Sequence, residues 1–164
     1  MFSEHGFAAT FQSAEALHDL VLPTRDVSKA AHRERVAAVA DALESARLPE
    51  ATVDWATKVL ASRNDKPLGR KIEDLVRSTG AVGKAVLDAD PTFGATTAAA
   101  RTGVSHGGAE KALDAAGRYW YGQVLRWIVR TRLLMDLLAD ADQTQERVTK
   151  LAAFRFALKE IKGD

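Results

Sequence analysis

The sequence contains no cysteine and only four prolines among its 164 residues. The lack of cysteine excludes disulfides, thiolate nucleophiles and cysteine-based zinc or iron sites. Basic and acidic residues nearly balance, with 23 Lys and Arg against 22 Asp and Glu, so the net charge of +1 does not indicate a nucleic-acid-binding protein. Any site for a polyanion must therefore be local.

Long hydrophobic segments are also missing. No stretch approaches the roughly 20 uninterrupted apolar residues of a membrane span. The most apolar stretch, 119–138, contains Arg126, Arg130 and Arg132. The N-terminal segment lacks the basic-then-apolar order of a signal peptide. We therefore expect a soluble, cytoplasmic protein with no membrane partner.

Helical periodicity dominates the sequence that remains. Alanine is abundant, and β-branched residues do not form the alternating runs that are typical of strands. We predict an all-α fold, a bundle of about five to seven helices with a long central helix. The expected helices span about 4–22, 26–48, 51–61, 67–89, 90–106, 109–139 and 144–162. We expect a single helical domain over residues 1–164, with the C-terminal part of a longer protein as an open alternative.

Apolar residues at steps of three and four predict which helix faces point to the core. In the first helix these residues are Phe7, Phe11, Ala14, Leu17 and Val21. The helix over 51–61 presents Val53, Ala56, Val59 and Leu60 toward the core, flanked by Trp55. In the two last helices the expected core includes Leu113, Trp120, Val124, Trp127, Ile128, Leu134, Leu137, Leu138, Val148, Leu151, Phe154, Phe156 and Leu158.

The histidines and carboxylates do not form a metal-binding pattern. His5, His18, His32 and His106 fall in different predicted elements without the HxxxH or HExxH spacing of metal ligands. No Asp or Glu cluster projects from a single turn to hold magnesium or calcium. We expect no metal and no cofactor, so a hydrolytic reaction would have to work without a metal ion.

One histidine stands at a junction that favours exposure of polar groups. His106 lies between an alanine-rich helix and Gly107-Gly108, where a helix end leaves backbone donors accessible. Arg101 precedes it by five residues, and five residues of regular helix turn the chain by about 140°. The two side chains converge only if Gly103 lets the backbone turn or if a second copy of the chain supplies one of them.

The segment RTGVSH, Arg101 to His106, resembles the mark of the HEPN superfamily, which is Arg, four to six intervening residues, and His at a helix boundary. Three further segments are similar to the ApeA-like branch: FQSAEALH at 11–18, SRNDKPLGRKIEDLV at 62–76 and GRYWYGQVLRWIVRTRLLMDLL at 117–138. The resemblance implies a homodimer that places two Arg/His pairs around a shared cleft and cuts single-stranded or loop RNA, with tRNA as one candidate.

Such a pair has the chemistry for metal-free RNA cleavage. An imidazole with a pKa of about 6.5 can take the 2′-hydroxyl proton or protonate the leaving oxygen near neutral pH. Arg101 would stabilise the charge that builds on phosphorus. Thr102 stands where many members carry an amide, and Ser105, the amides after Gly107 and Lys111 are weaker candidates for phosphate binding.

Ordinary structural roles compete with each of these interpretations. His106 can cap a helix, and Arg101 can be a surface ion-pair partner. The aromatic residues Tyr119, Trp120, Tyr121 and Trp127 are typical of a core or an oligomer interface more than of a base-stacking platform. The remaining histidines are assigned surface or packing roles. Two groups of basic residues are expected on solvated faces, with guidance of RNA as the alternative. The first group is Arg118, Arg126, Arg130 and Arg132, and the second is Arg63, Lys66, Arg70 and Lys71.

The sequence thus leads to one main hypothesis and two alternatives. The main one is a metal-independent endoribonuclease of bacterial anti-phage defence or stress, with Arg101 and His106 as catalytic residues. The alternatives are a catalytically silent HEPN module that binds a nucleotide or a partner protein, and a plain helical dimerisation domain.

Overall fold

All regular secondary structure in the described residues of the computed structural model is helical, which confirms the all-α prediction. The structure describes residues 4–106, 113–138 and 140–163, without the side chains of 4, 5 and 103–106. Its helices are α1 (Glu4–Val21), α2 (Lys29–Ser45), α3 (Glu50–Ala61), α4 (Leu68–Arg77), α5 (Ala81–Ala89), α6 (Phe93–His106), α7 (Ala115–Leu137), α8 (Ala141–Lys150) and α9 (Ala152–Lys162).

The chain divides into two compact units. One unit, called the bundle here, comprises residues 1–22 and 68–164, and the other, called the hairpin, comprises residues 23–67. The hairpin is therefore inserted between α1 and α4 in the sequence. The expectation of a single domain over 1–164 stays a prediction.

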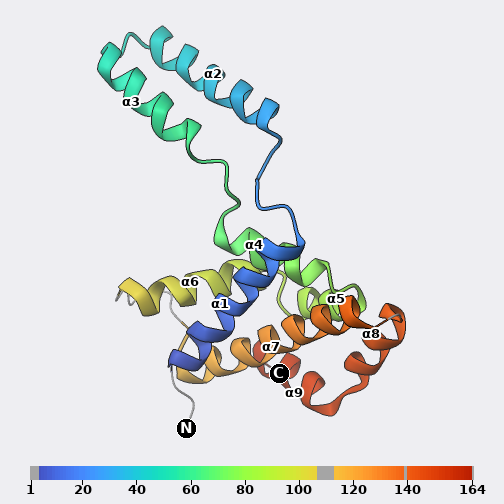
Figure 1. The fold of residues 1–164 in the computed structure, drawn as a ribbon. Coiled ribbons are helices and arrows are strands. Elements are labelled where there is room, and N and C mark those ends of the chain that lie inside the picture. Colours follow the sequence, from blue (N-terminus) through green and yellow to red (C-terminus); the bar gives the residue numbers. More distant parts are fainter. Residues whose placement is uncertain (1–3, 107–112, 139, 164) are drawn as a thin grey trace. The chain divides into compact units, whose positions relative to one another are not determined.

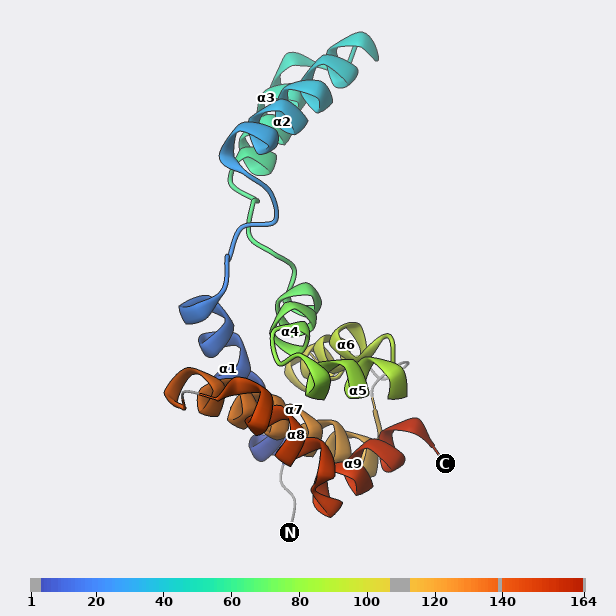
Figure 2. The ribbon, with the colours of Figure 1, turned by 90° about the vertical axis from the view of Figure 1, so that its right-hand side faces the viewer.

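The core of the bundle follows the predicted stripe of α1. Phe7, Phe11 and Ala14 are fully buried, and Leu17 is 7% exposed. Figures 1 and 2 show α1 beside α7, with α4, α5 and α6 grouped together and α8 and α9 following α7. The other large side chains that close this core are Ile72, Leu75, Val76, Val82, Val86, Phe93, Val124, Leu125, Ile128 and Phe154. Burial of such an apolar stripe on each helix is what holds the helices in the bundle.

The segment 67–89, expected as one helix, forms α4 and α5. Gly80 adopts a φ of +59°, which residues with a Cβ rarely adopt. The chain therefore changes direction between α4 and α5. Gly83 then lets α5 approach α4 so closely that a Cβ would overlap the carbonyl oxygen of Val76. The last segment is likewise divided at Leu151, which separates α8 from α9.

The long helix α7 is shorter at both ends than the expected 109–139. Asp114 caps its start, and the carboxylate accepts a hydrogen bond of 2.6 Å from the Gly117 backbone N–H. At the other end the predicted core residues Leu134, Leu137 and Leu138 are 40%, 79% and 52% exposed. That part of the core prediction was wrong because helical periodicity finds an apolar face but does not show whether another element covers it. Leu151 and Phe156 are exposed for the same reason.

The hairpin pairs α2 with α3 and has almost no core of its own. Its base is held by Asn64, whose side chain donates to the Val27 carbonyl at 3.1 Å and accepts from the Val27 N–H at 3.4 Å. Within the described residues α2 buries no side chain and α3 buries only Val53. The prediction that Val59 and Leu60 face a core was therefore wrong, since both remain exposed.

In the part of the chain that the structure describes, no helix combines the length and the apolar character needed to cross a bilayer.

Candidate active site

The helix that carries Arg101 and His106, α6, is fixed at its start by a partly buried polar contact and a buried aromatic one. Asp90 accepts hydrogen bonds from the Thr92 N–H at 2.8 Å and from the Tyr121 hydroxyl at 2.7 Å. The Tyr121 ring stacks on Phe93, the first residue of α6, with centroids 5.2 Å apart. Burial, together with the Asp90 carboxylate, raises the pKa of Tyr121 well above its ordinary value, so the hydroxyl keeps its proton.

Two glycines let α6 lie directly against α4. A Cβ on Gly94 would lie 2.5 Å from the carbonyl oxygen of Gly69. A larger residue at this position would therefore force the two helices apart. The buried hydroxyl of Thr97 donates a hydrogen bond of 2.6 Å to the Phe93 carbonyl, and Ala100 is fully buried. The first two turns of α6 are thus held in one position and one rotation.

The predicted site residues lie in the last turns of α6 and beyond it. Arg101 is half-buried, and Thr102 is exposed with its hydroxyl donating to the Ala98 carbonyl at 3.0 Å. The backbone of Ser105 and His106 is helical, whereas their side chains lie outside the described residues, as does Lys111. The amides that follow Gly107 lie outside them as well. The assignment of Arg101 and His106 as catalytic residues therefore stays a prediction.

The backbone of α6 tests one of the two ways in which Arg101 and His106 could meet. The helix continues through Gly103 to His106, so the chain does not turn at Gly103. Five helical residues separate the two positions by about 140° around the helix axis. The other way, in which a second copy of the chain supplies one of the two residues, stays a prediction.

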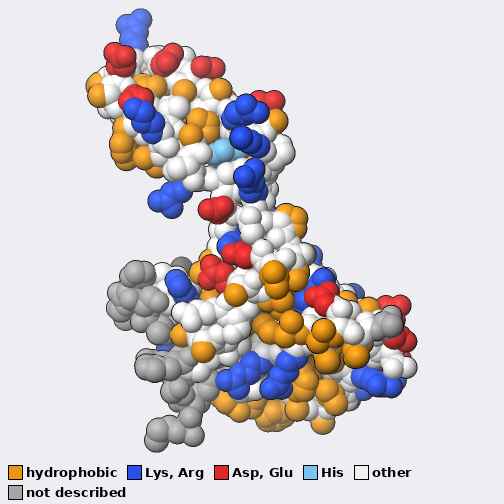
Figure 3. Space-filling view, viewed as in Figure 1, with side chains coloured by type: hydrophobic (Ala, Val, Ile, Leu, Met, Phe, Trp, Pro, Cys, Tyr) orange, Lys and Arg blue, Asp and Glu red, His pale blue; other side chains and the backbone are white. Residues whose placement is uncertain are grey.

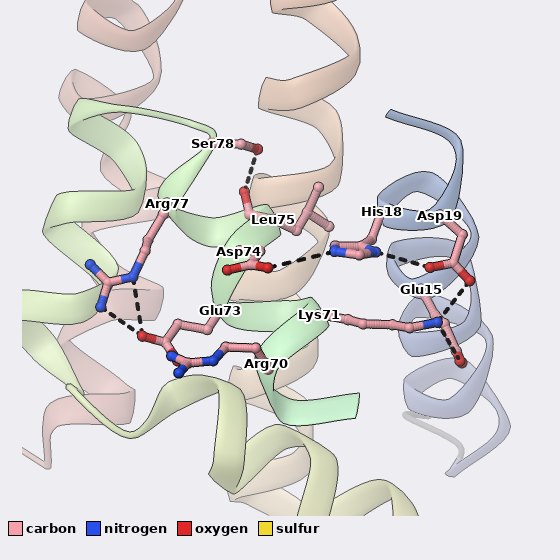
Figure 4. A network of polar contacts seen from close by, with 10 residues as sticks. All are labelled: Glu15, His18, Asp19, Arg70, Lys71, Glu73, Asp74, Leu75, Arg77 and Ser78. Atoms are coloured by element: carbon pink, nitrogen blue, oxygen red, sulfur yellow. Dashed lines mark hydrogen bonds and ion pairs between the residues drawn. The ribbon is translucent and has the colours of Figure 1, made fainter. Parts of the chain in front are cut away.

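A second polar group in the bundle was not predicted from the sequence. His18 of α1 is fully buried, with its Nδ1 2.9 Å from Asp19 Oδ1 and its Nε2 3.9 Å from Asp74 Oδ2 (Figure 4). Lys71 of α4 donates to Asp19 Oδ2 at 2.8 Å and lies 3.9 Å from Glu15. These residues tie α1 to α4 at the point in the sequence where the hairpin is inserted.

The electrostatics of this group correct one prediction. Lys71, expected on a solvated basic face, is buried, and its hydrogen bond, followed by that of His18, lowers the pKa of Asp19 below the ordinary value of 3.8. A signal for the buried histidine was present in the sequence, because His18 continues the stripe of Phe7, Phe11 and Ala14 by one further step of four.

The His, Asp and Glu side chains of the described residues are dispersed. Within them no three His, Asp or Glu side chains are grouped as a metal ion would require. The His18 group contains one imidazole and three carboxylates, but Lys71 already occupies the centre between two of those carboxylates.

Comparison with known protein families gives one finding. The model of the family described as Apea-like HEPN matches residues 9–143, which is most of the chain and includes the whole segment from Arg101 to His106. Comparisons with curated proteins and with solved structures give no match.

Proposed function

Since the chain belongs to the Apea-like HEPN family, we propose that it is a metal-independent endoribonuclease acting through Arg101 and His106. One observation carries the proposal: Arg101 and His106, with four residues between them, lie within the matched residues. They stand in the last turns of a helix whose start is held by Asp90 and Tyr121. The family is associated with ribonuclease or nucleotide-binding modules, and this spacing favours the ribonuclease.

The reaction needs only groups that this chain supplies. One imidazole takes the proton of the 2′-hydroxyl, whose oxygen then forms a bond to the neighbouring phosphorus. The bond from phosphorus to the 5′-oxygen breaks, and a second, protonated imidazole gives its proton to that oxygen. The products are a 2′,3′-cyclic phosphate and a free 5′-hydroxyl. His106 of each of two copies would serve as base and acid.

Arg101 would stabilise the charge that develops during this reaction. A guanidinium stays protonated at neutral pH and presents paired N–H donors to phosphate oxygens. Such donors contribute most when negative charge accumulates on the oxygens around phosphorus. Because one α6 places positions 101 and 106 about 140° apart, Arg101 acts with the His106 of the second copy.

Biological context belongs to the same proposal. The resemblance to the ApeA-like branch suggests a nuclease of bacterial anti-phage defence or stress that works as a homodimer. RNA is the partner, with tRNA as the first substrate to test. Further domains of a longer chain could control access to this site.

The test is cleavage of total tRNA by the purified protein in EDTA. We expect cleavage by the wild type and by His32→Ala, a control histidine in the hairpin. His106→Ala should lower the rate by about 10²- to 10⁴-fold, the usual contribution of a general acid or base. Arg101→Ala should lower it by about 10²- to 10³-fold. If no variant and no wild-type preparation cleaves RNA, the chain is the silent binding module.

A further inference from the structure

Two arginines of α7, Arg126 and Arg130, lie between two hollows of the bundle surface. They are four residues apart, so they occupy the same face of α7 about 6 Å apart along its axis. On one side a groove of about 310 Å³ separates them from the small residues Gly6, Ala9 and Ser13 of α1. Figure 3 shows basic and hydrophobic side chains together over the region of α1 and α7.

Neither arginine has a carboxylate partner within the described residues. Arg126 donates from Nε to the Thr10 hydroxyl at 3.2 Å, and that hydroxyl donates to the Gly6 carbonyl at 2.8 Å. Arg130 lies over the Trp127 ring at 5.6 Å from its centroid. Thr10 and Trp127 thus orient both guanidinium groups without neutralising them.

Arg132, two residues further along α7, shows the contrast. It makes a bidentate pair with Asp136, with distances of 3.0 and 2.7 Å. Among the described residues, α7 therefore has one arginine with a carboxylate beside it, Arg132, and two that are oriented by other groups, Arg126 and Arg130. Uncompensated arginines held by side chains in this way are typical of sites for phosphate oxygens.

The second hollow, on the α9 side of the same arginines, is lined by aromatic rings. Its volume is about 180 Å³, and Tyr119, Trp120, Trp127 and Phe156 line it. Trp120 and Phe156 meet edge to face at 5.2 Å, and Phe156 is 52% exposed. Tyr119, Trp120 and Trp127 are only half-buried, so part of each ring remains accessible. Rings beside arginines suit unstacked bases.

Charge distinguishes this surface from the larger hollow of the hairpin. That hollow has a volume of about 570 Å³ but is lined by Glu44, Glu50 and Asp54. Asp54 is paired with Lys58, but the carboxylates of Glu44 and Glu50 would still repel a polyanion, although the hollow is roomier. Size therefore does not select the site for a nucleic acid here, whereas uncompensated positive charge does.

We propose that the face of α7 between α1 and α9 binds single-stranded RNA, with Arg126 and Arg130 on the backbone phosphates and the aromatic hollow on a base. The choice of RNA as the ligand rests on the proposed ribonuclease function. The inference adds the surface on which the substrate strand lies beyond the cleavage site. A single strand fits better than a duplex because the bases of a duplex are stacked on each other and do not reach aromatic rings.

The experiment measures binding without cleavage. The probe is a fluorescently labelled, mixed-sequence single-stranded RNA with 2′-O-methyl groups, which blocks attack by the 2′-oxygen. Arg126→Gln/Arg130→Gln should weaken binding by roughly tenfold. It should also make the negative slope of log K against log salt shallower by about 1.4, because two contacts to a single strand are lost. Arg132→Gln, the matched control on the same helix, should change Kd by less than about twofold.

A further variant separates base stacking from charge. Phe156→Ser should weaken binding by roughly fivefold or more without changing the salt slope, because a stacked base is lost and no phosphate contact is. Circular dichroism of each variant reports whether the bundle has kept its fold.

Three results would overturn the inference. One is unchanged binding by the double variant, and another is equal weakening by Arg132→Gln. The third is a loss of self-association by the double variant with RNA binding intact, which would assign the face to contact between copies. Failure of the proposed function gives a different pattern, because the wild type would bind the probe but cleave no natural RNA. Cleavage by a wild type whose Kd does not depend on Arg126 and Arg130 would sink only this inference.

Discussion

The bundle and the hairpin are built from similar helices, yet they bury their apolar residues to very different extents. In the bundle, Phe7, Phe93 and Ile128 are fully buried, whereas α3 of the hairpin buries only Val53 and leaves Trp55 66% exposed. An amphipathic pattern therefore does not by itself say how much stability a helix gains. The gain depends on how many other helices cover the apolar face.

The largest expected effect is the removal of a core ring from the bundle. Phe93→Ala should lower the free energy of unfolding by about 3–5 kcal/mol, because it leaves a cavity and removes the ring that stacks on Tyr121. Trp55→Ala in the hairpin removes a larger side chain but should cost less than about 0.5 kcal/mol, since that ring is mostly in water. Urea denaturation of both variants measures the difference. Similar losses would contradict the contrast between the two units.

A smaller effect tests how closely α5 approaches α4. Gly83→Ala should lower the free energy of unfolding by about 1–3 kcal/mol, because the new methyl group overlaps the Val76 carbonyl. Helix propensity alone predicts the opposite sign, a gain of about 1 kcal/mol. The midpoint of thermal unfolding, read by circular dichroism, decides between the two. An increase would show that the two helices are further apart.

The smallest effect concerns the polar group that ties α1 to α4. The pKa of Asp19 is lowered in the folded protein, so its contribution to stability is present above its unfolded value of 3.8 and is lost as the pH falls through the folded value. Asp19→Asn should cost up to about 1 kcal/mol at pH 7, since the carboxylate is partly in water. The cost should vanish on acidification below the folded pKa.

The control for Asp19 is a carboxylate of the hairpin. Asp54 pairs with Lys58 at 2.7 Å on an exposed face of α3. Asp54→Asn should leave the unfolding curve unchanged at both pH values, because exposed pairs of this kind contribute little. Equal responses of the two variants to pH would show that burial of Lys71 adds nothing to the Asp19 interaction.

Sequence reasoning predicted local features of the fold better than long-range ones. The buried stripe of α1 followed from the spacing of Phe7, Phe11 and Ala14, because helix geometry alone fixes which residues share a face. The exposure of Leu137 did not follow, since it depends on which elements lie opposite, far away in the sequence. The insertion of a separate unit between α1 and α4 also depends on such distant contacts.

The candidate site shows the same division. The helix under Arg101 could be predicted from its alanine content. The burial of Lys71 could not, because its partner Asp19 is 52 residues away. The uncompensated charge of Arg126 was equally hidden, since only the structure shows that Thr10 orients it and that Asp136 pairs with Arg132 instead.

The most direct test of the proposed function is a dimer in which only one copy keeps its imidazole. The wild-type chain and His106→Ala are co-expressed with different affinity tags, and the mixed dimer is purified through both tags. If the His106 side chains of the two copies act as base and acid in one shared cleft, the mixed dimer has lost one of them and should cleave RNA in EDTA about 10²- to 10⁴-fold more slowly than the wild type. Cleavage by the mixed dimer at half of the wild-type rate would show that each copy works alone and would contradict a catalytic site shared between two copies.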